Sequence, residues 1–141
     1  MEKGNRMRIL IIDDSKKDRE LVITYILQSN NGSNKKIKTD ESNCMQNALS
    51  KLDMYDYDVI ILDLSLPESG GIETIQQIQS KLKEKSKKTP IVVLTGHEDY
   101  KVGIKAFTLG IKDFLLKDEI QEKDLSRALN LATYNTPMLK I

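Results

Sequence analysis

Four short apolar runs constrain the fold of this 141-residue chain more than any other feature of its sequence. Their apolar residues are continuous rather than alternating, which is typical of strands covered on both faces in a parallel sheet. The runs are RILII, VIILDL, PIVVLT and DFLL, at 8–12, 59–64, 90–95 and 113–116. A weaker run, KKIKT at 35–39, alternates and is expected to be an edge strand. The sequence therefore predicts a parallel sheet between two layers of other structure.

Segments with helical spacing separate these runs. Their apolar residues recur at intervals of three and four, which predicts amphipathic helices at 16–29, 44–53, 71–83, 99–109 and 122–134. The order is a strand followed by a helix, five times over, which predicts an α/β, doubly wound domain with a five-stranded parallel sheet. We expect the flavodoxin-like strand order 2-1-3-4-5.

Charge and composition narrow the class of protein. The chain has 22 basic and 21 acidic residues, and this balance argues against a nucleic-acid protein that binds by bulk attraction. Its one cysteine, Cys44, excludes an internal disulfide and is typical of a reducing compartment. No apolar run approaches the ~20 residues that span a bilayer, and no signal-peptide core is present. We expect one cytoplasmic domain over 1–141, with its core at about 7–134 and with no membrane or nucleic-acid partner.

Polar side chains gather at the carboxyl ends of the predicted strands, where open parallel sheets form their sites. Asp13 and Asp14 follow the first strand, and Asp63 lies at the end of the third. Thr95 ends the fourth strand and Lys117 follows the fifth. Each residue alone has a plainer interpretation, such as a helix cap or a turn. The expected strand order puts all of them at one crevice, and this joint placement indicates a site.

Three carboxylates held close together repel one another, and a divalent cation relieves that repulsion. Hard oxygen ligands with open positions suit Mg²⁺ (or Mn²⁺), which keeps water ligands and accepts a phosphoryl oxygen. A carboxylate beside such an ion can attack phosphorus and form an acyl phosphate. Lys117 can pair with the phosphoryl oxygens, and Thr95 can donate a hydrogen bond to one of them.

The sequence resembles the receiver domain of two-component response regulators, which has the CheY-like fold. The resemblance covers most of the chain and rests on IIDDS, DLSLPESGG, LTG and DFLLK. It implies that Asp63 is the phosphoacceptor. It also implies that Asp14 ligates Mg²⁺ directly, that Asp13 acts mainly through water, and that the backbone carbonyl of Ser65 is a further ligand.

The same resemblance implies a switch. Thr95 would move toward a phosphoryl group on Asp63, Lys117 would pair with that group, and the ring of Phe114 would enter the space that Thr95 leaves. The face made by the fourth helix, fifth strand and fifth helix would then change shape for a partner to read. Expected partners are a histidine kinase or histidine phosphotransfer protein and an unidentified downstream protein. The expected state is a monomer or a weak phosphorylation-dependent dimer, with no enzyme activity beyond self-catalysed phosphotransfer and slow autodephosphorylation.

The sequence departs from the family after the lysine, where Asp118 stands in place of the usual proline. A cis bond before a non-proline residue costs about 2.5–4 kcal/mol, so we expect the local loop to differ. The residues near the site that could position water are Ser65 and His97. The sequence leaves open whether the chain is a single-domain regulator or a receiver from a longer protein.

Three rival functions stay open at this point. A phosphatase of the haloacid dehalogenase type would carry a second aspartate two residues after the nucleophile, where this chain has Ser65. A flavodoxin-like cofactor binder would need a hydroxyl- or glycine-rich phosphate loop after the first strand, where this chain has IIDDSKKD. A pseudo-receiver would bind partners without phosphorylation, and nothing in the sequence demands it.

Overall fold

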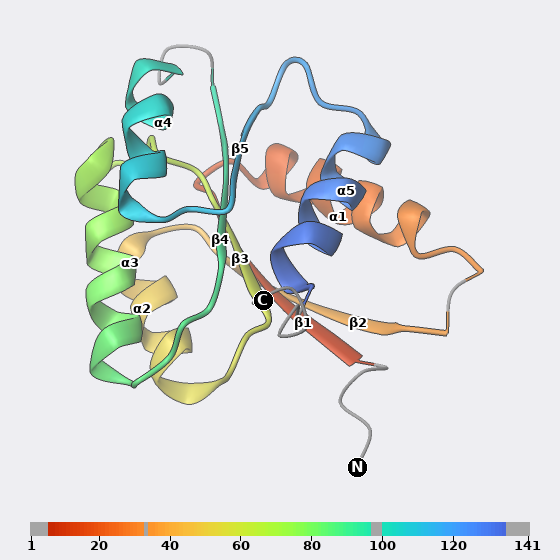
Figure 1. Cartoon of the computed structure of the whole chain (residues 1–141), viewed down its shortest axis with the longest axis horizontal. Coiled ribbons are helices and arrows are strands. Elements are labelled where there is room, and N and C mark those ends of the chain that lie inside the picture. The colour runs from red at the N-terminus through yellow and green to blue at the C-terminus, as the bar shows by residue number, and fades with distance from the viewer. Residues whose placement is uncertain (1–5, 33, 97–99, 135–141) are drawn as a thin grey trace, which may run out of the picture.

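A parallel sheet of five strands, in the order β2-β1-β3-β4-β5, forms the centre of the molecule (Figure 1). The structure is a computed structural model, and it describes residues 6–32, 34–96 and 100–134. The predicted fold class and strand order are confirmed. The elements are β1 (Arg6–Ile12), α1 (Lys16–Ser29), β2 (Lys36–Ser42), α2 (Met45–Met54), β3 (Val59–Leu62), α3 (Ile72–Glu84), β4 (Ile91–Thr95), α4 (Tyr100–Ala106), the 3-10 turn η3 (Phe107–Leu109), β5 (Asp113–Leu116) and α5 (Glu122–Thr133).

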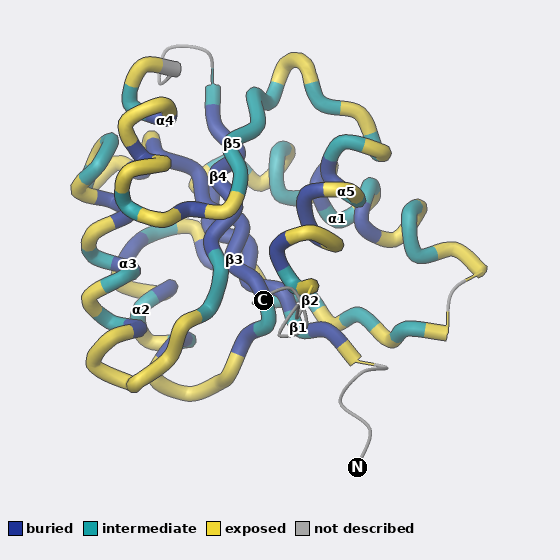
Figure 2. Tube along the Cα trace, in the orientation of Figure 1, coloured by how far each residue is buried: buried dark blue, intermediate teal, exposed yellow. Residues whose placement is uncertain are grey.

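Helices cover both faces of the sheet. In Figure 1, α2, α3 and α4 lie on one side and α1 and α5 on the other. The sequence of β3 is continuously apolar because both of its faces are buried. Ile60 and Leu62 pack into the core on the side of α2, α3 and α4, whereas Val59 and Ile61 pack into the core on the side of α1 and α5. Burying a side chain of this size stabilises the fold by roughly 1.5–3 kcal/mol. The three inner strands β1, β3 and β4 are accordingly the buried centre of the molecule (Figure 2).

The register of the sheet brings the ends of four strands together. Ile12 at the end of β1 pairs with Leu62 at the end of β3. Leu62 also pairs with Val93 of β4, and Thr95 at the end of β4 pairs with Leu116 at the end of β5. Side chains that follow these strands therefore reach the same edge of the sheet, as the strand order predicts.

The bounds of several elements differ from the sequence prediction; β1 begins at Arg6 and β2 extends to Ser42. The strand predicted at 59–64 ends at Leu62, because Asp63 already belongs to the loop at the edge of the sheet. The helix predicted at 99–109 is divided into α4 and η3, which ends at Gly110 with a φ of 91°. A glycine in this left-handed conformation commonly ends a helix, and a final 3-10 turn is frequent there. No helix in the described part of the chain is long and apolar enough to cross a membrane.

A glycine in α4 makes room for an aromatic ring from β5. A Cβ atom added to Gly103 would lie 2.1 Å from one ring carbon of Phe114, far inside van der Waals contact. Glycine inside a helix costs roughly 1 kcal/mol relative to alanine. The contact with Phe114 gives the physical reason for a glycine at this position.

We expect Gly103→Ala to lower the free energy of unfolding by about 1 kcal/mol net, because overpacking outweighs the better helix propensity. Chemical denaturation measures this change. In a Phe114→Ala background the same substitution should be neutral or stabilising, because the ring is gone. A stabilising effect in the unaltered protein would show that the ring does not press on α4.

Candidate functional site

Asp63 lies at the centre of the sheet edge and is held by its neighbours on both sides. Its backbone N–H donates to the carbonyl of Ile12 at 2.9 Å, and its residue is only 2% exposed. Its Oδ1 accepts hydrogen bonds from the hydroxyls of Thr95 at 2.7 Å and Ser65 at 3.0 Å. Its Oδ2 accepts a hydrogen bond from Nζ of Lys117 at 3.1 Å. The carboxylate is therefore fixed in position at the end of a rigid strand.

Lys117 contacts three carboxylates at once. Its Nζ lies 2.8 Å from Oδ2 of Asp13, 2.8 Å from Oδ2 of Asp18 and 3.1 Å from Oδ2 of Asp63. The backbone N–H of Lys117 donates to the carbonyl of Thr95 at 2.9 Å. This hydrogen bond to the end of β4 fixes the backbone position of Lys117. An ammonium group has three donors, and here each of them faces a carboxylate.

The predicted acidic cluster is formed. Carboxylate oxygens of Asp13, Asp14 and Asp63 lie within 4.8 Å of one another. Asp13 is buried and accepts a hydrogen bond from the backbone N–H of Ser15 at 2.9 Å, whereas Asp14 is exposed. Two fixed carboxylates and one that faces solvent suit Mg²⁺, which takes a few carboxylate ligands and keeps several waters. The donor set therefore fits Mg²⁺.

The two buried carboxylates have opposite pKa shifts. Burial raises the pKa of Asp13 to about 6, because hydrogen bonds such as that from Lys117 offset only part of the desolvation. Burial acts on Asp63 as well, but the hydrogen bond from Thr95 and the charge of Lys117 hold its pKa below the usual range. The pKa of Lys117 is raised, because its contacts with Asp13 and Asp18 outweigh its burial. Asp63 is therefore ionised at neutral pH.

Sequence reasoning missed two residues in the first turn of α1. Asp18 contacts Lys117, and Arg19 donates from Nη1 to the backbone carbonyl of Asp13 at 2.7 Å. Arg19 also donates from Nε to Glu41 of β2 at 2.8 Å. One signal could have found both residues. A helix that begins directly after a strand end places its first turn over the same edge, and Ser15 caps this helix.

The other predicted residues divide into two groups. Asp13, Asp14, Asp63, Thr95 and Lys117 come together as predicted. Ser65 reaches Asp63 through its hydroxyl and its backbone N–H, and its carbonyl as a metal ligand stays a prediction.

Phe114 lies apart from the acidic cluster. It is half-buried on β5, next to Gly103 of α4 and against the core on that side of the sheet. No cis peptide bond occurs among the described residues, which include Asp118. His97 lies outside the described residues.

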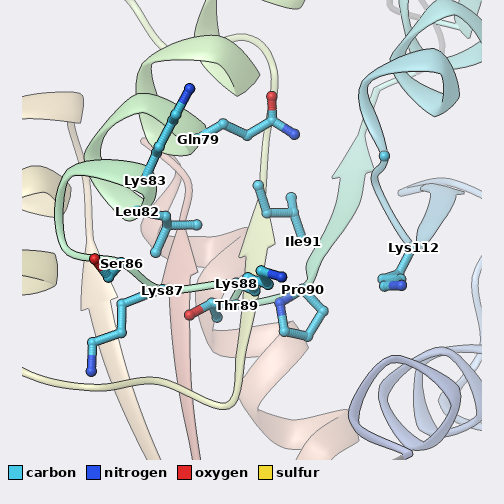
Figure 3. A pocket seen from close by; sticks show the side chains of 11 residues that line it. Gln79, Leu82, Lys83, Ser86, Lys87, Lys88, Thr89, Pro90, Ile91 and Lys112 are labelled. Carbon is cyan, nitrogen blue, oxygen red and sulfur yellow. The ribbon is translucent and has the colours of Figure 1, made fainter. Parts of the chain in front are cut away.

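A cavity of about 550 Å³ lies at the opposite end of the sheet, between the end of α3, the start of β4 and the turn before β5 (Figure 3). Leu82 and Ile91 form its apolar part, and its lysines are 83, 87, 88 and 112. The side chains of Lys83 and Lys87 point in different directions in Figure 3, and Lys87 pairs with Asp56 at 2.6 Å. The cavity shares no residue with the acidic cluster.

The opposite pKa shifts give a testable difference between two aspartates. In metal-free protein at pH 8, we expect Asp13→Asn to raise the free energy of unfolding by roughly 1–3 kcal/mol, because it removes a disfavoured buried charge. Asp63→Asn should lower it, because Asp63 is stabilised in its charged form.

The gain from Asp13→Asn should shrink as the pH falls from 8 through about 6. Asp13 has a higher pKa in the folded than in the unfolded chain, so over this range it becomes protonated in the folded chain and its disfavoured charge is lost. Chemical denaturation in the presence of a chelator, at several pH values, measures both variants. Shifts of the same sign for the two variants would contradict this account.

Comparison with known proteins agrees with the geometry. Residues 9–130 match the family described as response regulator receiver domain. The transcriptional regulatory protein ResD of Bacillus subtilis is 32% identical over 83% of this chain and 44% of its own length. The sensory transduction protein LytR of Staphylococcus epidermidis is 32% identical over 88% of this chain and 45% of its own length. The chain thus spans less than half the length of these relatives.

Solved structures support the fold. A response regulator receiver domain protein from Clostridium thermocellum matches with a TM-score of 0.72 at 24% identity, over 90% of this chain and 94% of its own. Likeness at this identity bears on the fold alone, whereas the family match covers most of the sequence. With its five parallel strands in CheY-like order and its acidic edge, the chain belongs to the receiver domains of two-component response regulators.

Proposed function

We propose that this chain is one phosphorylatable receiver domain, in which Asp63 accepts a phosphoryl group from a histidine kinase or a histidine phosphotransfer protein. A single observation carries the proposal. The carboxylate of Asp63 is buried and ionised, and it contacts the hydroxyl of Thr95 and the ammonium of Lys117. Its oxygen lies within 4.8 Å of carboxylate oxygens of Asp13 and Asp14 at the same edge. These are the groups that a carboxylate nucleophile for phosphorus requires.

The proposed transfer forms one bond to phosphorus and breaks another. An oxygen of Asp63 forms a bond to phosphorus while the bond from phosphorus to the histidine nitrogen breaks, and the imidazole keeps the electron pair. The hydrogen bond from the Asp63 backbone to Ile12 helps to fix the nucleophile in place, which reduces the entropic part of the barrier. Bound Mg²⁺ or Mn²⁺, held by Asp13, Asp14, Asp63 and the carbonyl of Ser65, would neutralise charge on the phosphoryl oxygens.

Thr95 and Lys117 would then carry the signal. Phosphorylation adds about −1.5 to −2 charges and strong acceptors at Asp63. Thr95 already donates to Asp63, and its backbone carbonyl accepts from Lys117, so a shift of Thr95 bears directly on β5. Phe114 lies on the same strand against Gly103 of α4. The face of α4, β5 and α5 is therefore the one that we propose for an unidentified downstream protein.

The proposal has a defined scope. The domain is proposed to work in the cytoplasm, as a monomer or a weak phosphorylation-dependent dimer. Its chemistry is limited to phosphotransfer to itself and slow loss of the phosphoryl group. The hydroxyl of Ser65 lies at the position where a phosphatase of the haloacid dehalogenase type would carry its second aspartate, and it donates to Asp63 instead.

Phosphorylation is tested by mass. We expect purified protein incubated with acetyl phosphate and Mg²⁺ to gain the mass of one phosphoryl group, and we expect Asp63→Asn to gain none. Asp53→Asn is the matched control, because Asp53 is exposed on α2 and pairs with Lys81 far from the cluster. A folded protein that gains no mass, or a gain that survives Asp63→Asn, would contradict the proposal.

Metal binding is tested separately by stability. Each tenfold rise in free Mg²⁺ above its dissociation constant should add about 1.4 kcal/mol to the free energy of unfolding, because the ion binds the folded chain. Asp13→Asn should lose this dependence and Asp53→Asn should keep it. Calorimetry or thermal denaturation across a Mg²⁺ series gives the slope. Equal slopes for all three proteins would argue against a site at the acidic cluster.

A further inference from the structure

Asp18 is a fourth carboxylate at the site, and no step of the proposed phosphorylation uses it. It lies in the first turn of α1, where the hydroxyl of Ser15 accepts a hydrogen bond from its backbone N–H at 3.2 Å. Its Oδ2 is 2.8 Å from Nζ of Lys117, a residue 99 positions away in the sequence. This distance equals that from Asp13 and is shorter than the 3.1 Å from Asp63.

The number of N–H donors on the ammonium group limits how many acceptors Lys117 can serve. Lys117 has three N–H donors, and they face Asp13, Asp18 and Asp63. A phosphoryl oxygen on Asp63 can take a donor from Lys117 only if one of the three contacts is given up. Asp13 and Asp63 have another cation available, since both belong to the cluster that suits Mg²⁺. Asp18 lies outside that cluster, and Lys117 is the cation that it pairs with among the described contacts. Its carboxylate therefore continues to attract the ammonium toward α1 and away from a phosphoryl group on Asp63.

We propose that Asp18 is a positioning residue that competes with the phosphoryl group for Lys117 and so slows the phosphorylation of Asp63. The inference rests on the proposed phosphorylation and adds a residue that tunes it. The side chain of Asp18 is 37% exposed and that of Lys117 is 22% exposed, so water screens the contact only in part. The first turn of α1 also orients Asp18, which limits how far its carboxylate can follow a moving lysine.

A plainer account of Asp18 must be separated from this one. Acidic residues in the first turn of a helix are stabilised by the helix dipole, whatever lies beyond them. Under that account, replacing Asp18 would lower the stability of α1 slightly and leave the chemistry of Asp63 unchanged. Glu20 offers a matched control for charge, because it is an exposed carboxylate on the same helix and its side chain has no ion pair among the described contacts.

The test compares initial phosphorylation rates with acetyl phosphate and saturating Mg²⁺ in four proteins. We expect Asp18→Asn to react about two- to fivefold faster than the unaltered protein, the size typical of a partly exposed ion pair. Asp18→Glu should restore part of the slower rate, and Glu20→Gln should match the unaltered protein. Circular dichroism checks that α1 stays folded in each variant.

A second measurement does not depend on phosphorylation. In metal-free protein with ¹⁵N-labelled lysine, the Nζ signal of Lys117 should shift in Asp18→Asn, which removes one of its three contacts, and stay unchanged in Glu20→Gln. An Asp18→Asn rate that is unchanged or lower, while the unaltered protein is phosphorylated, overturns the inference and leaves the proposed function intact. If no variant takes up a phosphoryl group, the proposed function and this inference fall together.

Discussion

The contact between one ammonium group and three carboxylates is the interaction on which the candidate site depends. Lys117 contacts Asp13 directly after β1, Asp18 in α1 and Asp63 directly after β3, so it joins segments far apart in the sequence at one edge of the sheet. Without this cation the charges of Asp13 and Asp63 would repel one another unopposed. Burial and the nearby charge of Asp63 both disfavour the charged form of Asp13. The acidic side chains are thus held close together by Lys117 at one edge of the sheet.

The buried strands make this charge cluster possible. β3 is apolar on both faces and packs into the core on each side of the sheet, which fixes its direction. Asp63 follows β3 directly and is therefore held at the edge of the sheet. The neighbouring strands add Thr95 and the backbone contacts of Ile12. A carboxylate placed by backbone pairing and packing keeps its position when its charge changes, and a switch requires this property.

Much of the fold and of the site could be predicted from the sequence. Continuous apolar runs identified the parallel strands, and the strand order then placed Asp13, Asp14, Asp63, Thr95 and Lys117 together. The division of α4 from η3 was missed, because a final 3-10 turn is frequent at helix ends and the apolar spacing does not distinguish it from an α-helix. Asp18 was missed because an acid in a first helical turn has an ordinary local explanation.

The sequence by itself determined which side chains can stand at the edge of the sheet, because periodicity sets the strands and each strand end has a definite residue. Only the tertiary structure decided in which direction the pKa of each buried carboxylate shifts. Asp13 and Asp63 have the same chemistry and the same burial, yet their pKa values shift in opposite directions. The reason is geometric: Lys117 contacts both carboxylates, and the hydroxyl of Thr95 donates a further hydrogen bond to Asp63, at distances that no spacing in the sequence encodes.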